Sequence, residues 1–344
     1  MADRRRADSH DRLLSFACIV TSVGALGLVG CTKRTPVASS SQHRCAQVNG
    51  ADIGTSRGAV VCKATALGGT GNKSSAQADG EKSNARAVAG SLDLFDQASP
   101  GDYRSSDNNA SLAVATHGAD ALARSGVNSR GAAGVGNNTA VARADQPRAV
   151  ADASAANGDN NVATSIAEGC IGAPGRACAF SVSGNGNRNV ATATSHGSDS
   201  KAQAGALDGD RNTALVAARD GGRAVANAQS GDDNIADSAA HGEKSFASAQ
   251  SSGSGSFALA RATGANSAAN ANAQKGGTAR ALAESGGSAS ANATGNAFTA
   301  TAYASGAGAS ASASHDADTD TGNCSGPGVS FAMTGGKFYC AQGF

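Results

Sequence analysis

The stretch "GEKSFASAQSSGSGSFALARAT", from Gly242 to Thr263, contains one phrase twice. Gly-x-x-Ser-Phe-Ala-x-Ala begins at Gly242 and begins again at Gly253, 11 residues later. After each Phe, alanine alternates with a variable residue, and a period of two is typical of a β-strand with one buried face. The stretch therefore predicts two successive units, each made of a turn and a strand of about five to seven residues.

The same unit recurs along most of the chain as Gly-x-x-Asn, Gly-x-x-Ser or Gly-x-x-Thr, for example "GNKS" at Gly71 and "GANS" at Gly264. We expect Gly to supply positive φ in each turn and the polar side chains to bond to nearby backbone. We predict that the residue after the polar position forms a ladder of Ile235, Phe246 and Phe257. The polar fourth position itself is predicted to advance in steps of 11 through Asn212, Arg223, Asn234, Ser245, Ser256, Ser267 and Thr278.

Stacking of such units predicts an all-β fold, an Ala-rich β-solenoid of roughly 11-residue strand-turn units. Two units per coil of about 22 residues give two flattened sheets, and alanine is required because nothing larger fits between them. We assign the solenoid to residues 45–320 and a C-terminal disulfide cap to residues 321–344. The segment from Ser91 to Arg104 breaks the pattern and is expected to loop out.

The composition leaves one alternative to this fold open. The 344 residues include no Trp, 46 Gly and only 3% aromatic residues, so the apolar fraction is mostly Ala. An Ala side chain buries little surface, at roughly 25 cal/mol per Å², and a disordered low-complexity chain has a similar composition. The formal net charge of +1 indicates no nucleic-acid partner.

The N-terminal residues have the pattern of an export signal. A basic segment from Arg4 to Arg6 precedes the uncharged, mostly apolar segment from Leu13 to Val29. The following "LVGC", Leu28 to Cys31, resembles the lipobox of bacterial lipoproteins. The resemblance implies that residues 1–30 are removed as a signal peptide and that Cys31 is lipidated. The alternative is an ordinary secretory signal peptide.

A lipid on Cys31 would hold the protein on the extracytoplasmic face of the cell membrane, which is then a partner of the chain. Residues 31–44, rich in Ser and Thr, are expected to form a flexible tether between this lipid and the solenoid.

Six cysteines remain after Cys18 and Cys31 are set aside, and an exported protein can form disulfides. They fall into three pairs that are close in sequence, although six cysteines allow 15 pairings. A zinc site is the rival interpretation, but the sequence contains no C-x-x-C. The predicted pairs are Cys45–Cys62, Cys170–Cys178 and Cys324–Cys340.

The Gly-x-x-Ser/Asn turns and alternating Ala are similar to the head repeats of trimeric autotransporter adhesins. This resemblance implies a rigid surface module used for spacing or adhesion, with an envelope or host-surface ligand as its partner. We expect no enzyme and no cofactor, because no nucleophile, base or metal spacing stands out. Acidic turns such as "GDDN" at Gly231 leave a calcium- or glycan-binding solenoid open as an alternative function. A disordered surface spacer is the other alternative.

Overall fold

The structure is a computed structural model in which the chain divides into residues 1–39 and residues 40–344, and only the second unit is described below. The signal peptide, Cys31 and the segment from Ser91 to Arg104 lie outside the described residues. The described residues are 44–47, 53–54, 61–66, 73–79, 84–89, 109–116, 120–125, 137–145, 150–156, 160–168, 178–184, 188–197, 200–208, 211–220, 222–230, 233–253, 255–275, 277–285, 287–294, 299–306, 309–315, 321–325, 329–334 and 339–341.

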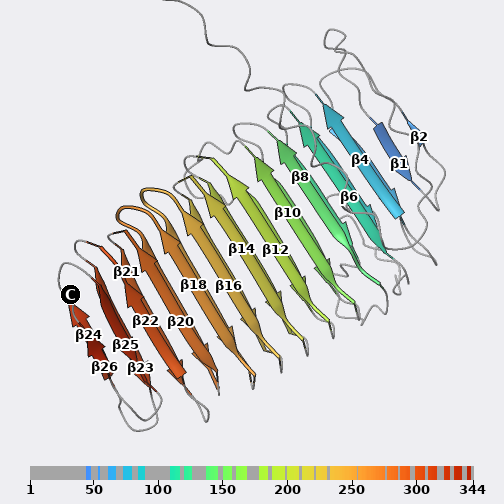
Figure 1. The fold of residues 1–344 in the computed structure, drawn as a ribbon. Helices are drawn as coiled ribbons and strands as arrows, with labels where there is room; N and C mark the ends of the chain where they lie inside the picture. Colours follow the sequence, from blue (N-terminus) through green and yellow to red (C-terminus); the bar gives the residue numbers. More distant parts are fainter. Residues whose placement is uncertain are drawn as a thin grey trace, which may run out of the picture. The chain divides into compact units, whose positions relative to one another are not determined.

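Strands alternate between two sheets along the chain, so the predicted two-sheet β-solenoid is confirmed (Figure 1). The 14-stranded sheet, here sheet A, has the order β2 Ile53–Gly54, β1 Arg44–Gln47, β4 Lys73–Asp79, β6 Ala110–Thr116, β8 Ala140–Asp145, β10 Val162–Glu168, β12 Val190–His196, β14 Thr213–Arg219, β16 Ile235–His241, β18 Phe257–Thr263, β20 Thr278–Glu284, β22 Thr299–Ala304, β25 Ser330–Met333 and β26 Tyr339–Ala341. The 12-stranded sheet, here sheet B, has the order β24 Thr321–Ser325, β23 Ser310–His315, β21 Ser288–Thr294, β19 Ala268–Gln274, β17 Phe246–Ser252, β15 Arg223–Gln229, β13 Lys201–Leu207, β11 Ala179–Gly184, β9 Ala151–Ala156, β7 Asp120–Ser125, β5 Asn84–Ala89 and β3 Val61–Ala66.

Each strand between β4 and β21 pairs in parallel with the strand that follows one full coil later. Ile235 of β16, for example, pairs with Phe257 of β18, 22 residues further along the chain. The coil length varies, because Thr278 pairs with Thr299 while Val162 pairs with Val190. The strands keep their register because only the turns between them differ in length.

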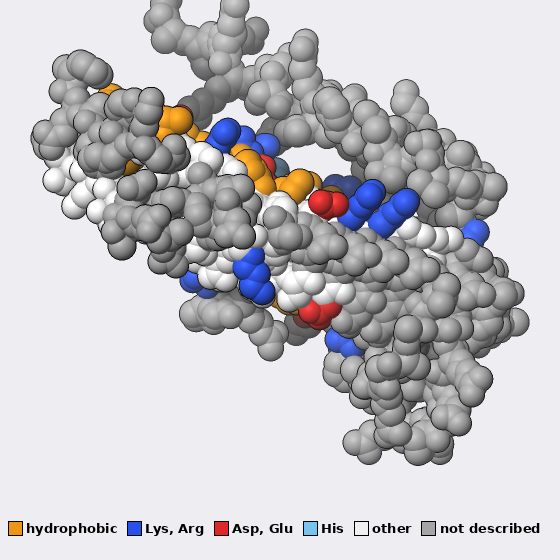
Figure 2. Space-filling model, turned by 90° about the horizontal axis from the view of Figure 1, so that it is seen from below, with side chains coloured by type: hydrophobic (Ala, Val, Ile, Leu, Met, Phe, Trp, Pro, Cys, Tyr) orange, Lys and Arg blue, Asp and Glu red, His pale blue; other side chains and the backbone are white. Residues whose placement is uncertain are grey.

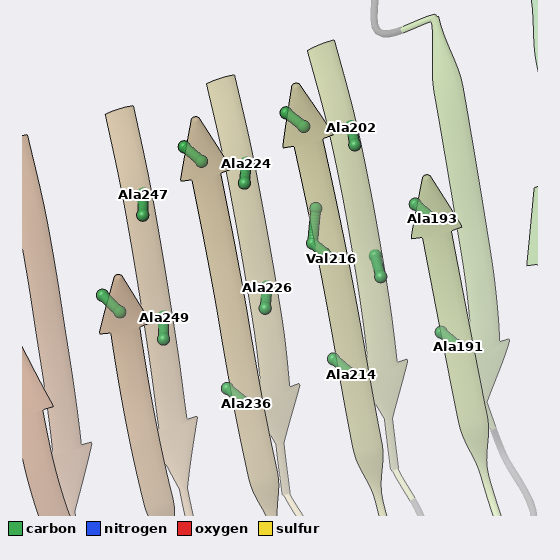
Figure 3. Close-up of a cluster of buried hydrophobic side chains, with 14 of the residues drawn as sticks. Ala191, Ala193, Ala202, Ala214, Val216, Ala224, Ala226, Ala236, Ala247 and Ala249 are labelled. Atoms are coloured by element: carbon green, nitrogen blue, oxygen red, sulfur yellow. The ribbon is translucent and has the colours of Figure 1, made fainter. Parts of the chain in front are cut away.

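Alanine fills the space between the two sheets, as its alternation predicts. Ala247 and Ala249 of β17 are buried, and so are Ala258 and Ala260 of β18 on the other sheet. Figure 3 shows such side chains on strands of both sheets, with Val216 as a rare larger member. Because each methyl group buries little surface, the continuous ladder of backbone hydrogen bonds must supply much of the stability.

The prediction that the polar fourth position advances in strict steps of 11 residues was wrong at Arg223 and Thr278. Arg223 is the first residue of β15 and pairs with Phe246, and Thr278 pairs with Phe257. Gly222 and Gly277 stand in the position before the strand instead, because the turns that precede them are one residue shorter.

The predicted ladder of Ile235, Phe246 and Phe257 was also wrong. Ile235 and Phe257 pair in sheet A, whereas Phe246 belongs to sheet B. Successive units of a two-sheet coil face opposite directions, so residues 11 apart cannot stack. The column neighbour of Phe246 is Arg223, whose guanidinium carbon lies 5.0 Å from the centre of the ring.

Antiparallel strands close the ends of the stack. At the N-terminal end β1 pairs antiparallel with β4 and with β2. At the C-terminal end β24 pairs antiparallel with β23, and β25 with both β22 and β26. Among the described strands, three of the four edges of the two parallel ladders are covered in this way, and β3 remains the N-terminal edge of sheet B. A covered edge does not offer unpaired backbone groups.

Candidate functional surfaces

The repeated phrase Gly-x-x-Ser forms a turn that binds one carbonyl of the next coil at two points. The amide N–H of Gly242 donates to Thr263 O at 2.9 Å, and Ser245 Oγ donates to the same oxygen at 3.2 Å. Within the turn, Ser245 N–H donates to Gly242 O at 3.4 Å, and Gly242 has a φ of 129°. Because a carbonyl oxygen has two lone pairs, both bonds can be made at once. We call this arrangement the carbonyl clamp.

The clamp recurs on both edges of the stack. Asn212 Nδ2 and Asp208 N–H share Gln229 O, at 3.0 and 3.1 Å. Four further side chains donate to a carbonyl that lies 17 to 19 residues ahead in the chain. Ser200 donates to Arg219 O and Asn189 donates to Leu207 O. Ser256 donates to Gln274 O and Ser267 donates to Glu284 O. The polar side chains thus bond a full coil away, whereas the sequence predicted bonds to nearby backbone.

Asparagine occupies this position at the start of six successive strands of sheet A, from β6 to β16, and all six side chains are buried. A column of stacked amides inside a parallel sheet resembles the ladders of cross-β structures in geometry. Asn161 differs from its neighbours because neither Nδ2 nor Oδ1 has a hydrogen-bond partner. The column consists of Asn109, Asn138, Asn161, Asn189, Asn212 and Asn234.

The outer face of sheet A carries at least one aliphatic or aromatic side chain on each parallel strand from β6 to β20, and Thr and charged side chains lie between them. Leu112, Leu215 and Ile235 are the most exposed of them, at 38 to 41%. Figure 2 shows hydrophobic side chains in a row bordered by Lys, Arg, Asp and Glu side chains. We define the aliphatic face as Leu112, Val114, Val141, Val162, Ile166, Val190, Leu215, Ile235, Phe257, Leu259 and Leu282.

Charged side chains on this face pair with each other. Arg261 Nη2 of β18 lies 2.9 and 3.1 Å from the two carboxylate oxygens of Asp237 on β16. Arg143 Nη2 lies 3.5 Å from Glu168 Oε1. The two ion pairs neutralise four charges next to the aliphatic residues.

The outer face of sheet B is polar in its C-terminal half. The register stacks Asn227, Gln250, Asn272 and Asn292 in one column across β15, β17, β19 and β21. The Oδ1 atoms of Asn272 and Asn292 are buried without a hydrogen-bond partner. We call this column the amide column.

The middle of sheet B contains a half-buried carboxylate. Asp152 of β9 lies between Leu122 of β7 and Phe180 of β11, and its Oδ1 has no hydrogen-bond partner. Burial raises the pKa of Asp152, and the charge of Arg124 opposes that rise.

Four of the six candidate disulfide cysteines lie on described strands at the two ends of the stack. Cys45 pairs with Ala76 in sheet A and Cys62 pairs with Ala85 in sheet B. Both alanines are fully buried, so these cysteines occupy inward register positions. At the other end Cys324 pairs with Ala311 in sheet B, and Cys340 pairs with Ala332 in sheet A.

Cys178 precedes β11 and is buried, whereas Cys170 lies outside the described residues. The three predicted disulfide pairs stay a prediction. Cys31 also lies outside the described residues.

Across the described ranges, no group of three or more His, Cys, Asp and Glu side chains could hold a metal ion. In the same part of the chain, no helix has the length and apolar character to cross a membrane.

No known family or protein matches. Neither the family models, nor the curated proteins, nor the solved structures contain a significant match to this sequence. The surfaces described above are therefore the basis for any statement about function.

Sequence reasoning missed the buried asparagine column, because Asn in Gly-x-x-Asn is equally typical of an exposed turn. The spacing of the asparagines in the sequence nevertheless indicates the column. When units are compared with the second unit along rather than the next one, Asn189, Asn212 and Asn234 fall in one column. The aliphatic face was hidden in the same way, because its residues appear only in every other unit.

Proposed function

We propose that this chain is a cell-envelope lipoprotein whose solenoid is a rigid spacer with an adhesin-like surface. The observation that carries this proposal is the pair of uninterrupted parallel ladders, β4 to β22 in sheet A and β3 to β23 in sheet B. Antiparallel strands cover both edges of the first ladder and the C-terminal edge of the second. Strands spaced by about 4.8 Å make the ten parallel strands of sheet A about 45 Å long. A stack of this kind favours a rod over a disordered spacer.

The lipid anchor is proposed from the sequence "LVGC" alone. It is tested by growing cells with labelled palmitate and isolating the protein. We expect the label in the wild type and its loss in Cys31→Ala. Cys18→Ala is the matched control, because Cys18 lies within the expected signal peptide and should leave labelling unchanged. A label that survives Cys31→Ala would refute the anchor.

We also propose that disulfides join the two sheets at each end, as Cys45–Cys62 and Cys324–Cys340. Their support is the register, since each pair contributes one inward position from each sheet at the same end. Peptide mapping without reduction should recover these two cross-linked peptides and a third that joins Cys170 to Cys178. Recovery of any other pairing, or of free Cys45 and Cys62, would refute the staples.

The amide column supports one alternative, a glycan-binding module. Amide side chains can donate and accept hydrogen bonds with sugar hydroxyls, and two of these amides have an unpartnered Oδ1. A glycan array probed with the wild type and with the double variant Asn272→Ala, Asn292→Ala tests this function. Binding that the double variant loses would support it, and an absence of binding by the wild type would remove it.

A further inference from the structure

Across the described strands at its C-terminal end, sheet B has an outer face on which no position is charged. The face consists of the outward positions of β17, β19, β21, β23 and β24, which are neighbours in the sheet. Each of these positions is Ser, Thr, Asn or Gln, except Phe246 and Ala268 at the starts of β17 and β19. By contrast, the outward positions of the preceding strands include Asp152, Lys201 and Arg223. We call the outer surface of these five strands the neutral face.

The neutral face is a regular grid of hydrogen-bonding groups. Strands about 4.8 Å apart, with outward residues about 6.6 Å apart along each strand, give a surface roughly 20 Å across the sheet and about 13–20 Å along the strands. In one column of this grid, Ser288 Oγ and Ser310 Oγ lie 3.2 Å apart and share a hydrogen bond. In the amide column, Gln250, Asn272 and Asn292 follow one another on successive strands. One ligand on this face can therefore meet several amides and hydroxyls at a constant spacing.

The chemistry of the neutral face excludes several classes of partner. Nucleic acids and anionic lipid surfaces bind basic groups, and stable protein interfaces have an apolar core, whereas this face offers neither. A charged polymer would lose hydration against side chains that cannot neutralise it. Amides and hydroxyls both donate and accept hydrogen bonds, and so do the hydroxyls of a sugar. The complementary ligand is therefore uncharged and rich in hydroxyl groups.

We propose that the neutral face binds a neutral polysaccharide, a linear polymer of uncharged sugars. A polymer of one repeated sugar presents its hydroxyls at a constant interval, as the columns of the face present their amides and hydroxyls. Hydrogen bonds that are weak one by one then act together, because each further sugar binds at the high local concentration that the polymer provides. This inference rests on the glycan-binding alternative proposed above and specifies the class of glycan.

Retention on immobilised polymers tests the class of ligand. The full chain, purified in detergent, is passed over dextran, laminarin and cellulose, which are neutral, and over alginate and chitosan, which carry negative and positive charge. We expect at least one neutral polymer to bind the chain at least tenfold more tightly than either charged polymer does. Tighter binding to alginate or chitosan would overturn the inference and leave a glycan-binding function standing. Binding to none of the five would also overturn it, and the glycan array then decides whether glycan binding of another kind stands.

Gln250→Ala and Gln77→Ala are a matched pair of variants that locate the binding surface. Each removes one outward amide, but Gln250 lies within the neutral face and Gln77 lies on β4 of sheet A. We expect Gln250→Ala to raise the dissociation constant for the retaining polymer at least fivefold and Gln77→Ala to leave it unchanged. Circular dichroism confirms that both variants are folded.

Two results with these variants would contradict the proposal. A folded Gln250→Ala variant that binds the polymer as tightly as Gln77→Ala would place the binding elsewhere on the chain. A dimer in sedimentation equilibrium without polymer, present in Gln77→Ala and lost in Gln250→Ala, would assign the neutral face to a second copy of the chain. Either result overturns the inference, and neither affects the proposed spacer function.

Discussion

Gly222 lies where its coil closely approaches the preceding coil of the stack, and the structure predicts that no side chain is tolerated there. A Cβ at this position would lie 2.5 Å from Ser200 O and 2.8 Å from Ala218 Cβ, and it would also overlap Ser200 Oγ. Carbon atoms pack at about 3.5–4.0 Å, so the contact with Ala218 requires a local shift of roughly 0.7 Å, and the preceding coil must also move away at Ser200. Ser200 O accepts a hydrogen bond from Arg223 N–H at 2.8 Å. The same movement stretches this bond beyond a normal hydrogen-bond length.

The expected effect of Gly222→Ala follows from these two terms. Overpacking a tight site costs about 1–3 kcal/mol, and the weakened hydrogen bond adds about 1 kcal/mol. We expect a loss of about 2–4 kcal/mol in the free energy of unfolding. Thermal melts followed by far-ultraviolet circular dichroism should show a melting temperature lower by about 5 °C or more.

Gly205→Ala is the matched control. A Cβ at Gly205 would meet only the Cγ and Cδ1 atoms of Leu207, both at 3.9 Å, which is an ordinary contact. The substitution reduces the freedom of the unfolded chain and should stabilise the protein by about 0.4–1 kcal/mol. If Gly222→Ala and Gly205→Ala melt at the same temperature, the close approach between coils is not the reason why Gly222 must be glycine.

Three further predictions concern the polar groups. Asn212→Ala removes a buried hydrogen bond to Gln229 O and should lower the free energy of unfolding by about 1–3 kcal/mol. Asn161→Ala removes atoms without a hydrogen-bond partner and should cost much less. A larger loss of unfolding free energy for Asn161→Ala than for Asn212→Ala in chemical denaturation would contradict this prediction. Because the folded state raises the pKa of Asp152, it binds the proton more tightly than the unfolded state, and the contribution to stability is lost as pH rises. Asp152→Asn should therefore melt above the wild type at neutral pH and together with it at about pH 3, and a difference that is the same at both pH values would refute the assignment. Arg261→Ala breaks an exposed ion pair with Asp237 and should cost only about 0.2–1 kcal/mol; a larger loss in the same melts would show that the pair contributes more than its exposure implies.

Sequence periodicity was enough to predict the strands, the two sheets and the alanine core, because alternation of Ala258, Ala260 and Ala262 leaves one face for burial. It was not enough to assign each residue to a sheet. Gly222 follows Gly221 directly, and nothing local distinguishes a turn glycine from one pressed against the coil next to it. The sequence prediction was therefore off by one residue at this turn, and it placed Arg223 in the turn although Arg223 is the first residue of β15.

The surfaces were harder to predict than the fold for a related reason. Phe246 and Phe257 stand in identical phrases, yet they lie on opposite faces with different neighbours. A face is assembled from every other unit, so its character emerges only after the sheets are separated. The pairing of the end cysteines stays a prediction.

The carbonyl clamp has a consequence for how the protein is made. Each turn bonds to a carbonyl 17 to 19 residues ahead, and each strand pairs with the copy one coil later. A coil therefore needs only the next stretch of about 20 residues to be complete, so the stack can grow coil by coil as the polypeptide emerges from a ribosome or a narrow channel. The order of synthesis is then also the order of folding, and the unfinished end consists of one strand edge in each sheet that the next residues cover.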